Sequence, residues 1–312
     1  MRALILAAGL GVRMQPLSLL RPKPALPVLG LPVIGYLFEL LAANGVEEVM
    51  VNLHHRADQM RETAEQCCPS QLELHFSNES EPLGTGGGIR RVSSFLRDSD
   101  PALVLAGDML LDSDLAGFAR RHRERGDAAT LLLRSDERIA EFGPIGIDGE
   151  GAVRRIGNDF DLGGALRHGL FVGVRAFAPR CFDSLPDRDG PFEDLRDWLA
   201  PALRAGARDI RAECYDSDAV GWEPIGTPAE YLRANLEFDA RFDRAGARER
   251  APETRVTPGL VVGRGARLEP GARLEHAVVW DGETVPSEID ACGGVFAGGR
   301  FVATDSGAGE PA

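Results

Sequence analysis

Short apolar runs alternate with stretches of helical periodicity over the first 240 residues of the chain. One helical stretch opens at Pro32 and ends at Asn44–Gly45, and a second is expected over Asp112–Arg125. Further strands are expected over Val153–Ala176. This alternation predicts an α/β fold, with a mostly parallel sheet covered by helices on both faces. The apolar runs that predict its strands are Met1–Leu6, Val46–Asn52, Leu72–Phe76, Ala102–Leu105 and Ala128–Leu133.

From Thr257 the periodicity changes, because the pentapeptide GARLE occurs at 265–269 and again at 271–275. A period of six is typical of hexapeptide repeats, which stack aliphatic residues inside a parallel β-helix. The spaced inward positions are Val262, Leu268 and Leu274. Two or three coils fit before the tail, so this fragment must pack on the first domain or on another subunit.

These patterns divide the chain into four predicted segments. Residues 1–240 form the α/β domain and residues 241–256 a linker, and the helical stretch Ala229–Arg250 is expected to connect the two folded parts. Residues 257–303 form a short left-handed β-helix fragment. Residues 304–312 are small and polar, which predicts a disordered tail.

Composition narrows the class of protein. The formal net charge of −13 argues against a nucleic-acid partner, because the phosphates of a duplex require a basic face. The sequence has no apolar stretch long enough to cross a membrane. Five cysteines, of which Cys67 and Cys68 are adjacent, fit neither a disulfide framework nor a zinc site. We therefore expect a cytoplasmic protein that binds neither nucleic acid nor a membrane.

The loop after the first strand concentrates residues suited to binding phosphate. It follows the carboxyl end of a buried strand, where an open α/β sheet has its usual ligand crevice. Gly9 and Gly11 allow backbone N–H groups to approach an anion, and Arg13 and Lys23 add full positive charges. Prolines at positions 16, 22, 24 and 27 stiffen the return path of the loop.

Two common phosphate-binding motifs do not match this loop. A Walker A loop requires Lys followed by Ser or Thr directly after its last glycine, and the loop lacks that sequence. A dinucleotide-binding fingerprint requires a small residue where Met14 stands. It also requires an acidic residue where the second strand ends in Asn52 and Leu53.

The loop instead resembles the signature of the sugar-phosphate nucleotidyltransferases, and ProLysPro at 22–24 stands where that family keeps its signature lysine. Mannose-1-phosphate guanylyltransferases and MurNAc-1-phosphate uridylyltransferases are most similar, and GTGGGI favours the latter. The other motifs that follow in the family's order are VNLHH at 51–55, EPLGTGGGI at 81–89, LAGD at 105–108 and IGTPAEYLRAN at 225–235.

The resemblance implies a Rossmann-like sheet of the nucleotide-diphospho-sugar transferase fold. It also implies an enzyme that transfers a nucleoside monophosphate from a triphosphate to a sugar 1-phosphate and releases pyrophosphate. The implied substrates are GTP or UTP and a sugar 1-phosphate, with mannose-1-phosphate guanylyl transfer as the first expectation and magnesium (Mg²⁺) as the cofactor. A homo-oligomer could form through the β-helix fragment.

The resemblance also implies roles for individual residues. Arg13 and the backbone from Gly9 would hold the departing β- and γ-phosphates, and Lys23 would bridge the attacking and attacked phosphates. Asp108, directly after an apolar strand, would bind Mg²⁺. The turn at Gly84–Gly88 would present N–H groups to the base and ribose. The residues implied for the nucleotide are Leu6, Ala7, Ala8, Gly9, Leu10, Gly11, Gly84, Thr85, Gly86 and Gly107, and those for the sugar are Gly143, Asn158 and Gly169.

The chain departs from the family pattern at the second metal ligand. Pro224 stands where the family has an aspartate before IleGlyThr, and proline cannot bind a metal. Glu223 is the expected substitute, with Asp216 and Asp218 as alternatives. Val12 also replaces the usual threonine of the phosphate loop.

The GluLys pair that the family uses near the sugar is missing as well, and Arg154, Arg155 or Asn158 would have to substitute. Loss of one preorganised electrostatic contact costs roughly 10²–10³ in turnover, so a single unreplaced group predicts a slow enzyme. The alternative is a regulatory protein that binds a nucleotide sugar without efficient catalysis. Retention of Arg13, Lys23 and Asp108 favours the enzyme.

Several conspicuous side chains are not expected to be catalytic. Packing or a hydrogen bond in the sugar pocket is expected for His54 and His55. His54 and His55 are adjacent on a strand, so their side chains point to opposite faces and cannot easily serve one site. The tryptophans at positions 198, 222 and 280 are expected to fill hydrophobic cores.

Overall fold

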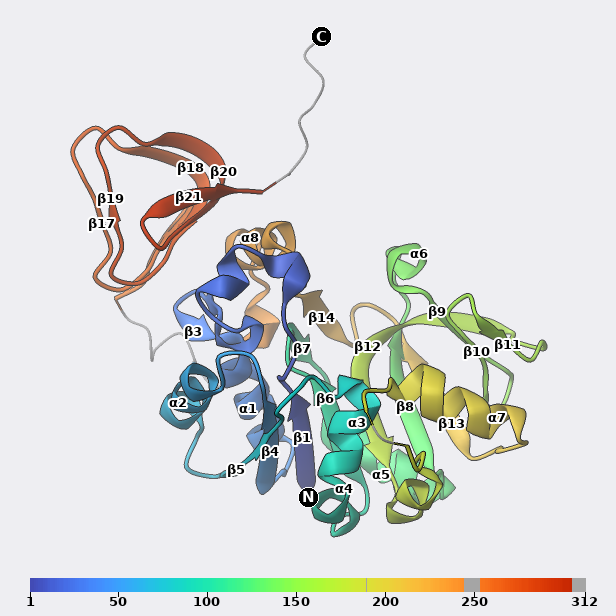
Figure 1. Ribbon diagram of the computed structural model, residues 1–312. Coiled ribbons are helices and arrows are strands. Elements are labelled where there is room, and N and C mark those ends of the chain that lie inside the picture. Colours follow the sequence, from blue (N-terminus) through green and yellow to red (C-terminus); the bar gives the residue numbers. More distant parts are fainter. Residues whose placement is uncertain (189, 244–252, 305–312) are drawn as a thin grey trace.

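The computed structural model describes residues 1–188, 190–243 and 253–304, and its centre is a ten-stranded sheet (Figure 1). The middle strand β1 (Arg2–Leu6) is flanked by β4 (Glu48–Leu53) and β6 (Ala102–Ala106), both parallel to it. Strand β5 (Glu73–Asn78) extends this parallel part at the edge beyond β4. These four of the five predicted strands therefore exist, with ends shifted by at most two residues, and the fifth, Ala128–Leu133, is β8 (Ala129–Arg134).

The other half of the sheet is built on the long strand β12 (Arg167–Phe177), which runs antiparallel to β6. β12 also pairs with β8 (Ala129–Arg134), and β13 (Ile210–Tyr215) lies parallel to β8. A small antiparallel extension consists of β9 (Pro144–Ile147), β10 (Val153–Ile156) and β11 (Phe160–Asp161).

Side chains of the central strands alternate between two hydrophobic cores, as expected for a sheet covered on both faces. Ile5 and Leu105 enter one core, and Leu4 and Val104 enter the other. The first core is closed by α1 (Val33–Ala43), α2 (Ala57–Cys67) and α5 (Leu115–Arg125). The second is closed by α3 (Gly84–Arg91), α4 (Ser93–Arg97) and α7 (Ala200–Arg204). The prediction of helices on both faces is confirmed.

The segment after β6 differs from its prediction. A helix was expected from Asp112, but the chain first forms β7 (Met109–Asp112), and α5 begins at Leu115 with Asp114 as its N-cap. Strand β7 pairs with β14 (Gly221–Pro224) in a separate two-stranded ribbon. The apolar residues of β7 are buried by this pairing, which a helical periodicity count does not detect. Other short elements are α6 (Ile139–Phe142), β2 (Pro27–Val28), β3 (Leu31–Pro32), the 3₁₀ turns η1 (Val12–Met14), η2 (Leu17–Leu19), η3 (Lys23–Ala25), η4 (Pro179–Ser184) and the π-helix η5 (Asp194–Leu199).

Residues 255–303 form the predicted β-helix fragment, seen in Figure 1 as a three-sided coil. Val261 pairs in parallel with Val278, and Val278 with Val295, so each coil takes 17 residues, close to three hexapeptides. Val262, Leu268 and Leu274 belong to the interior cluster, which confirms their predicted inward positions. The strands are β15 (Arg255–Thr257), β16 (Leu260–Val262), β17 (Arg267–Leu268), β18 (Arg273–Val279), β19 (Thr284–Val285), β20 (Asp290–Ala297) and β21 (Arg300–Ala303).

The β-helix packs on the chain's own α/β domain. Val278 and Val295 join the same hydrophobic cluster as α1, and α8 (Pro228–Leu236) contacts β16, β18 and β20. The predicted helix to Arg250 is wrong over residues 237–243, because α8 ends at Leu236 and a 3₁₀ turn, η6 (Ala240–Phe242), follows. Most of the predicted linker and of the predicted disordered tail lies outside the described residues. Among the helices described, none combines the length and apolarity needed to span a bilayer.

Candidate active site

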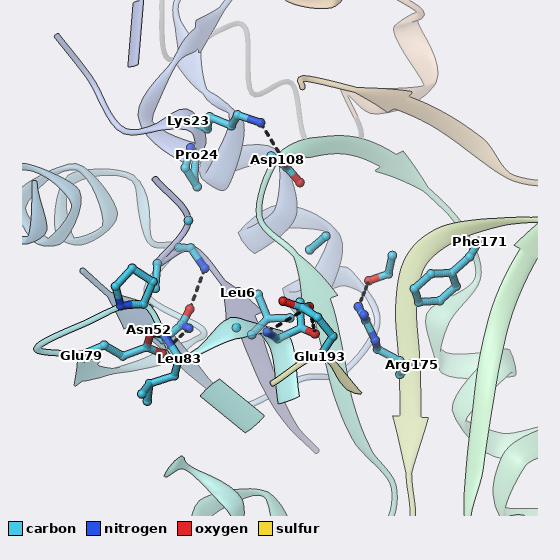
Figure 2. A pocket seen from close by; sticks show the side chains of 18 residues that line it. Leu6, Lys23, Pro24, Asn52, Glu79, Leu83, Asp108, Phe171, Arg175 and Glu193 are labelled. Atoms are coloured by element: carbon cyan, nitrogen blue, oxygen red, sulfur yellow. Dashed lines mark hydrogen bonds and ion pairs between the residues drawn. The ribbon is translucent and has the colours of Figure 1, made fainter. Parts of the chain in front are cut away.

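A cavity of about 390 Å³ lies at the carboxyl ends of β1, β4 and β6, where the sequence predicts the ligand crevice. Figure 2 shows charged side chains reaching into it from both halves of the sheet. One side carries Lys23 and Asp108, and β12 carries Arg175 on the other. The lining residues are Leu6, Ala7, Ala8, Gly9, Lys23, Pro24, Asn52, Glu79, Pro82, Leu83, Gly84, Thr85, Ala106, Asp108, Phe171, Gly173, Arg175 and Glu193.

The structure brings Lys23 and Asp108 together, although 85 positions separate them. Lys23 Nζ lies 3.3 Å from Asp108 Oδ2. The lysine side chain is 11% exposed, whereas the aspartate is 41% exposed and therefore open to the cavity. The Ile225 N–H donates to the Asp108 carbonyl oxygen at 2.8 Å, which ties the aspartate to the end of β14. A cation and an accessible carboxylate thus share one corner of the cavity.

A buried hydrogen-bond network shapes the start of the phosphate loop. The Ala7 N–H donates to Asn52 Oδ1 at 2.6 Å, and Asn52 Nδ2 donates to Glu79 Oε1 at 2.7 Å. Glu79 Oε2 accepts from the Leu83 N–H at 3.1 Å. The network joins three segments around the cavity, and the sequence reasoning missed it. Asn52 had been considered only as a missing ribose ligand, and its position at a strand end was the available signal.

Among the glycines that open α3, Gly86 packs against the protein, while Gly84 lines the cavity. The Gly86 N–H donates to the Phe192 carbonyl at 2.9 Å, so this donor faces the protein. A Cβ on Gly86 would lie 2.3 Å from the Phe192 ring, which explains why only glycine fits there. Thr85 donates to the Glu193 carboxylate at 2.7 Å. Gly84 and Thr85 still line the cavity, but Gly86 serves close packing against residues 192–194.

On β12 the structure selects a different glycine from the expected one. Gly173, with a φ of +86°, lines the cavity at an irregularity in the pairing of β12 with β8. Gly169 is buried within the sheet, where a Cβ would lie 2.7 Å from Cys214 Sγ. The bulge places Phe171 and Arg175 at the cavity as well. Gly169 does not line the cavity, and its expected role at the sugar stays a prediction. A bulge such as this one cannot be located from a strand pattern.

The other two residues expected at the sugar, Gly143 and Asn158, do not line the cavity. Gly143 lies beside Gly157, and exposed Asn158 accepts a hydrogen bond from Arg155 at 3.3 Å. On the β12 side of the cavity, Arg175 is buried and forms an ion pair with Asp194 through two hydrogen bonds, with Nε 2.6 Å from Oδ2. Its charge is therefore already neutralised.

The outer part of the phosphate loop lies beyond the cavity wall. Leu10, Gly11 and Arg13 are not among the lining residues, whereas Leu6 to Gly9 are. Exposed Arg13 lies beside Gly226, where its Nη2 would be 3.5 Å from a Cβ at that position. Gly107 contacts the first strand, since its N–H donates to the Leu6 carbonyl at 3.0 Å.

Glu223 does not meet Asp108. It lines a second cavity, of about 240 Å³, together with Arg134, Arg138 and Arg233. Its Oε1 lies 2.5 Å from Arg233 Nη2, and its Oε2 lies 3.7 Å from Arg138 Nη1. The expected replacement of the second metal aspartate by Glu223 is therefore wrong in its geometry, because both oxygens face guanidinium groups. Asp216 also lies elsewhere, 79% exposed and 3.7 Å from Arg167.

Asp108 and Glu193 are the accessible carboxylates that line the main cavity, and Asp108 is the one beside Lys23. Asp108 fits the usual pattern for Mg²⁺, in which one or two carboxylates combine with substrate oxygens and water. Glu79 is buried, and both its oxygens accept hydrogen bonds. A cluster of Glu48, Glu73 and His75 lies at the start of β4 and β5, away from the carboxyl ends that form the cavity. Its His75 Nε2 lies 3.3 Å from Glu48 and 3.5 Å from Glu73.

The two adjacent histidines bond to the backbone, and the three tryptophans are buried. His54 Nδ1 and His55 Nε2 contact the carbonyl oxygens of Glu79 and Ser18, at 3.0 and 2.9 Å. The three tryptophans are 2 to 6% exposed.

Fold and cavity together define an α/β protein with a ligand cavity at the carboxyl edge of its sheet. The chain belongs to the nucleotidyl transferase family, whose model matches residues 2–241. A mannose-1-phosphate guanylyltransferase of Mycobacterium tuberculosis is 32% identical over 297 residues, covering 91% of this chain and 80% of the relative. A UTP–glucose-1-phosphate uridylyltransferase of Synechocystis is 28% identical over 311 residues, covering 96% of this chain and 74% of the relative.

Among solved structures, HddC from Yersinia pseudotuberculosis, crystallised with GMP-PN, has a similar fold. It superposes with a TM-score of 0.62 at 23% identity, covering 76% of this chain and 99% of HddC. At this identity the likeness concerns the fold alone.

Proposed function

We propose that this protein transfers a nucleoside monophosphate from a nucleoside triphosphate to a sugar 1-phosphate, with GTP and mannose 1-phosphate as the first candidates. The observation that carries the proposal is the pairing of Lys23 with accessible Asp108 beside the phosphate loop. The guanylyltransferase of M. tuberculosis supports GTP and mannose 1-phosphate, and the Synechocystis relative keeps UTP and another sugar phosphate as the alternative.

In the proposed reaction, a phosphate oxygen of the sugar 1-phosphate forms a bond to the α-phosphorus of the triphosphate. The bond from the α-phosphorus to the oxygen bridging it to the β-phosphorus breaks, and pyrophosphate leaves with that electron pair. Both reactants are anionic, so catalysis consists mainly of positioning and charge neutralisation. Lys23, whose Nζ lies 3.3 Å from Asp108 Oδ2, would bridge the two phosphates as a positive point charge.

Other residues would bind and orient the substrates. Asp108 would hold Mg²⁺, which supplies further neutralisation of the triphosphate. The N–H groups of Ala8 and Gly9 would face the phosphates, since Asn52 already takes the Ala7 N–H. Arg13, which is exposed beside Gly226, would reach the β- and γ-phosphates of a bound triphosphate. The sugar would lie toward Phe171, Gly173 and Glu193.

A test is pyrophosphate release in magnesium, with each nucleoside triphosphate against a panel of sugar 1-phosphates. We expect release with GTP and mannose 1-phosphate above every other pair. Release with a different pair would change the assigned substrates and keep the reaction class. No release with any pair, together with measurable binding of a nucleotide sugar, would contradict the enzyme assignment.

That last outcome would support a second candidate, a regulatory protein that binds a nucleotide sugar. One observation favours this candidate. Pro224 stands where the family has a metal-binding aspartate, and Glu223 pairs with arginines, so of Asp108 and Glu223 only Asp108 is available to a metal. If nucleotidyl transfer requires a second carboxylate beside Asp108, the protein is a regulatory one. If Asp108 alone suffices, the protein is an enzyme.

Two further expectations belong to this proposal. We propose a cytoplasmic location, supported by the absence of disulfides among the five cysteines. We also propose that the protein forms a homo-oligomer through the β-helix fragment, which sedimentation of the full chain would measure.

A further inference from the structure

The β-helix reaches the segment that carries Lys23 through two consecutive hydrogen bonds. Trp280, which directly follows β18, is 3% exposed, and its Nε1 donates to Tyr231 Oη at 3.0 Å. Tyr231 lies on α8 and is fully buried, and its hydroxyl donates to the Pro27 carbonyl at 2.6 Å. Pro27 is four residues beyond Lys23. The hydroxyl of Tyr231 therefore joins the β-helix to the lysine segment.

The same segment is held at further points on both sides of Lys23. Before it, the guanidinium of Arg21 lies 4.7 Å from the centre of the Trp280 ring. Leu20 lies beside the turn between β20 and β21, where its Cδ1 would be 2.9 Å from a Cβ on Gly298. After it, the Leu29 N–H donates to Asn235 Oδ1 of α8 at 3.0 Å. The β-helix thus contacts the segment before Lys23, and α8 contacts it after.

The lysine segment contributes little regular structure of its own. Lys23 sits in η3, a single 3₁₀ turn, and the hydrogen bonds within it run from Ala25 to Pro22 and from Leu26 to Lys23. Isolated 3₁₀ turns have poor hydrogen-bond geometry and are short. The path of this segment over the cavity therefore depends on what packs behind it, namely Tyr231 and Trp280.

We propose that Tyr231 and Trp280 are positioning residues, through which the β-helix holds Lys23 at its place opposite Asp108. This inference rests on the proposed nucleotidyl transfer. Small displacements of a catalytic group, on the order of 1 Å, can cost about 10²-fold in rate. In the proposed function the nucleotide would be held by Ala7–Gly9 and the segment before α3, which line the cavity, whereas Tyr231 and Trp280 do not line it.

The first test is Tyr231→Phe, which keeps the ring and removes both hydrogen bonds. We expect kcat to fall roughly tenfold, with KM for the triphosphate changed less than about twofold. Trp280→Phe removes the donor to Tyr231 and should act in the same direction. The matched control is Trp198→Phe, since Trp198 is equally buried and donates to Ser184 at 2.9 Å, but lies in the other core. It should lower Tm without lowering kcat.

The second test places Tyr231→Phe in a Lys23→Ala background. If the tyrosine acts through Lys23, the second substitution should leave the residual turnover unchanged. A further tenfold loss in that background, an unchanged kcat in Tyr231→Phe alone, or an equal loss in Trp198→Phe would each overturn the proposal.

A third measurement does not depend on activity. Hydrogen exchange of amides in residues 20–29 should accelerate in Tyr231→Phe, while amides of β1 and β4 keep their protection. If wild-type protein shows no turnover with any substrate pair, the proposed function fails while this measurement still tests the contact. Unchanged exchange over residues 20–29 would show that Tyr231 does not hold the segment.

Discussion

Asp108 and Glu223 lie close to the same two-stranded ribbon, yet their surroundings give them different chemistry. Asp108 precedes β7, has one lysine at 3.3 Å and is 41% exposed in the main cavity. Glu223 lies within β14, is 20% exposed and has guanidinium partners at 2.5 and 3.7 Å. A carboxylate whose oxygens are held by arginines has little capacity left for a metal ion. The comparison shows that proximity in sequence to a missing ligand does not make a replacement.

The largest effect expected around Asp108 comes from removing its cation. Lys23→Ala should lower kcat by about 10³, because the charge that bridges the two phosphates is lost. Lys23→Arg should recover part of the loss, since it restores charge with different geometry. Pyrophosphate release measures both, and Tm should stay within a few degrees of wild type. Full turnover in Lys23→Ala would show that another cation does this work.

Asp108→Asn should be next in size, with a loss of about 10² in kcat. The amide keeps the shape of the side chain and removes the charge that would hold Mg²⁺. We also expect the magnesium concentration needed for half-maximal rate to rise. A magnesium titration of wild type and variant measures this. An unchanged titration curve would mean that Asp108 does not bind the ion.

Glu223→Gln should affect stability more than catalysis. The substitution leaves Arg233 and Arg138 without their shared anion, which we expect to cost about 1 kcal/mol in the free energy of unfolding. Turnover and magnesium dependence should stay within about twofold of wild type. Urea unfolding and the same titration test the two halves of the prediction. A strong rise in the magnesium requirement would restore Glu223 as a ligand and remove the contrast with Asp108.

The smallest effect is expected at Asn158, which sits on an exposed turn bonded to Arg155. Asn158→Ala should leave KM for the sugar 1-phosphate within about twofold of wild type. Glu193→Gln, at a residue that lines the cavity, is the comparison variant and should raise that KM more. The reverse order would indicate that the turn at Asn158 closes over the sugar when substrate binds.

The prediction succeeded where neighbours in sequence carry the information. The apolar runs located four strands of the sheet, and the six-residue period located the inward residues Val262, Leu268 and Leu274. Ala7, Ala8 and Gly9 line the cavity because a loop at the carboxyl end of a central parallel strand has few other places to lie. These features depend on periodicity and on short spacings.

The sequence did not predict features whose position depends on strand register or on a partner far along the chain. Gly173 lines the cavity and Gly169 does not, because the pairing of β12 with β8 is irregular between Phe171 and Arg175. The sequence does not predict β7 as a strand, because its partner β14 lies more than a hundred residues away. Asn52 and Glu79 were not recognised because their roles arise from hydrogen bonds among three separate segments.

The amino-acid sequence alone determined the family, the positions of the central strands and the coil of the β-helix, since each follows from local pattern. Tertiary structure decided which carboxylate is available, which glycine faces the cavity and what lies behind Lys23. The reason is physical: a side chain's charge, exposure and position are set by the groups packed against it. For Asp108, Glu223 and Lys23, those groups come from distant parts of the chain.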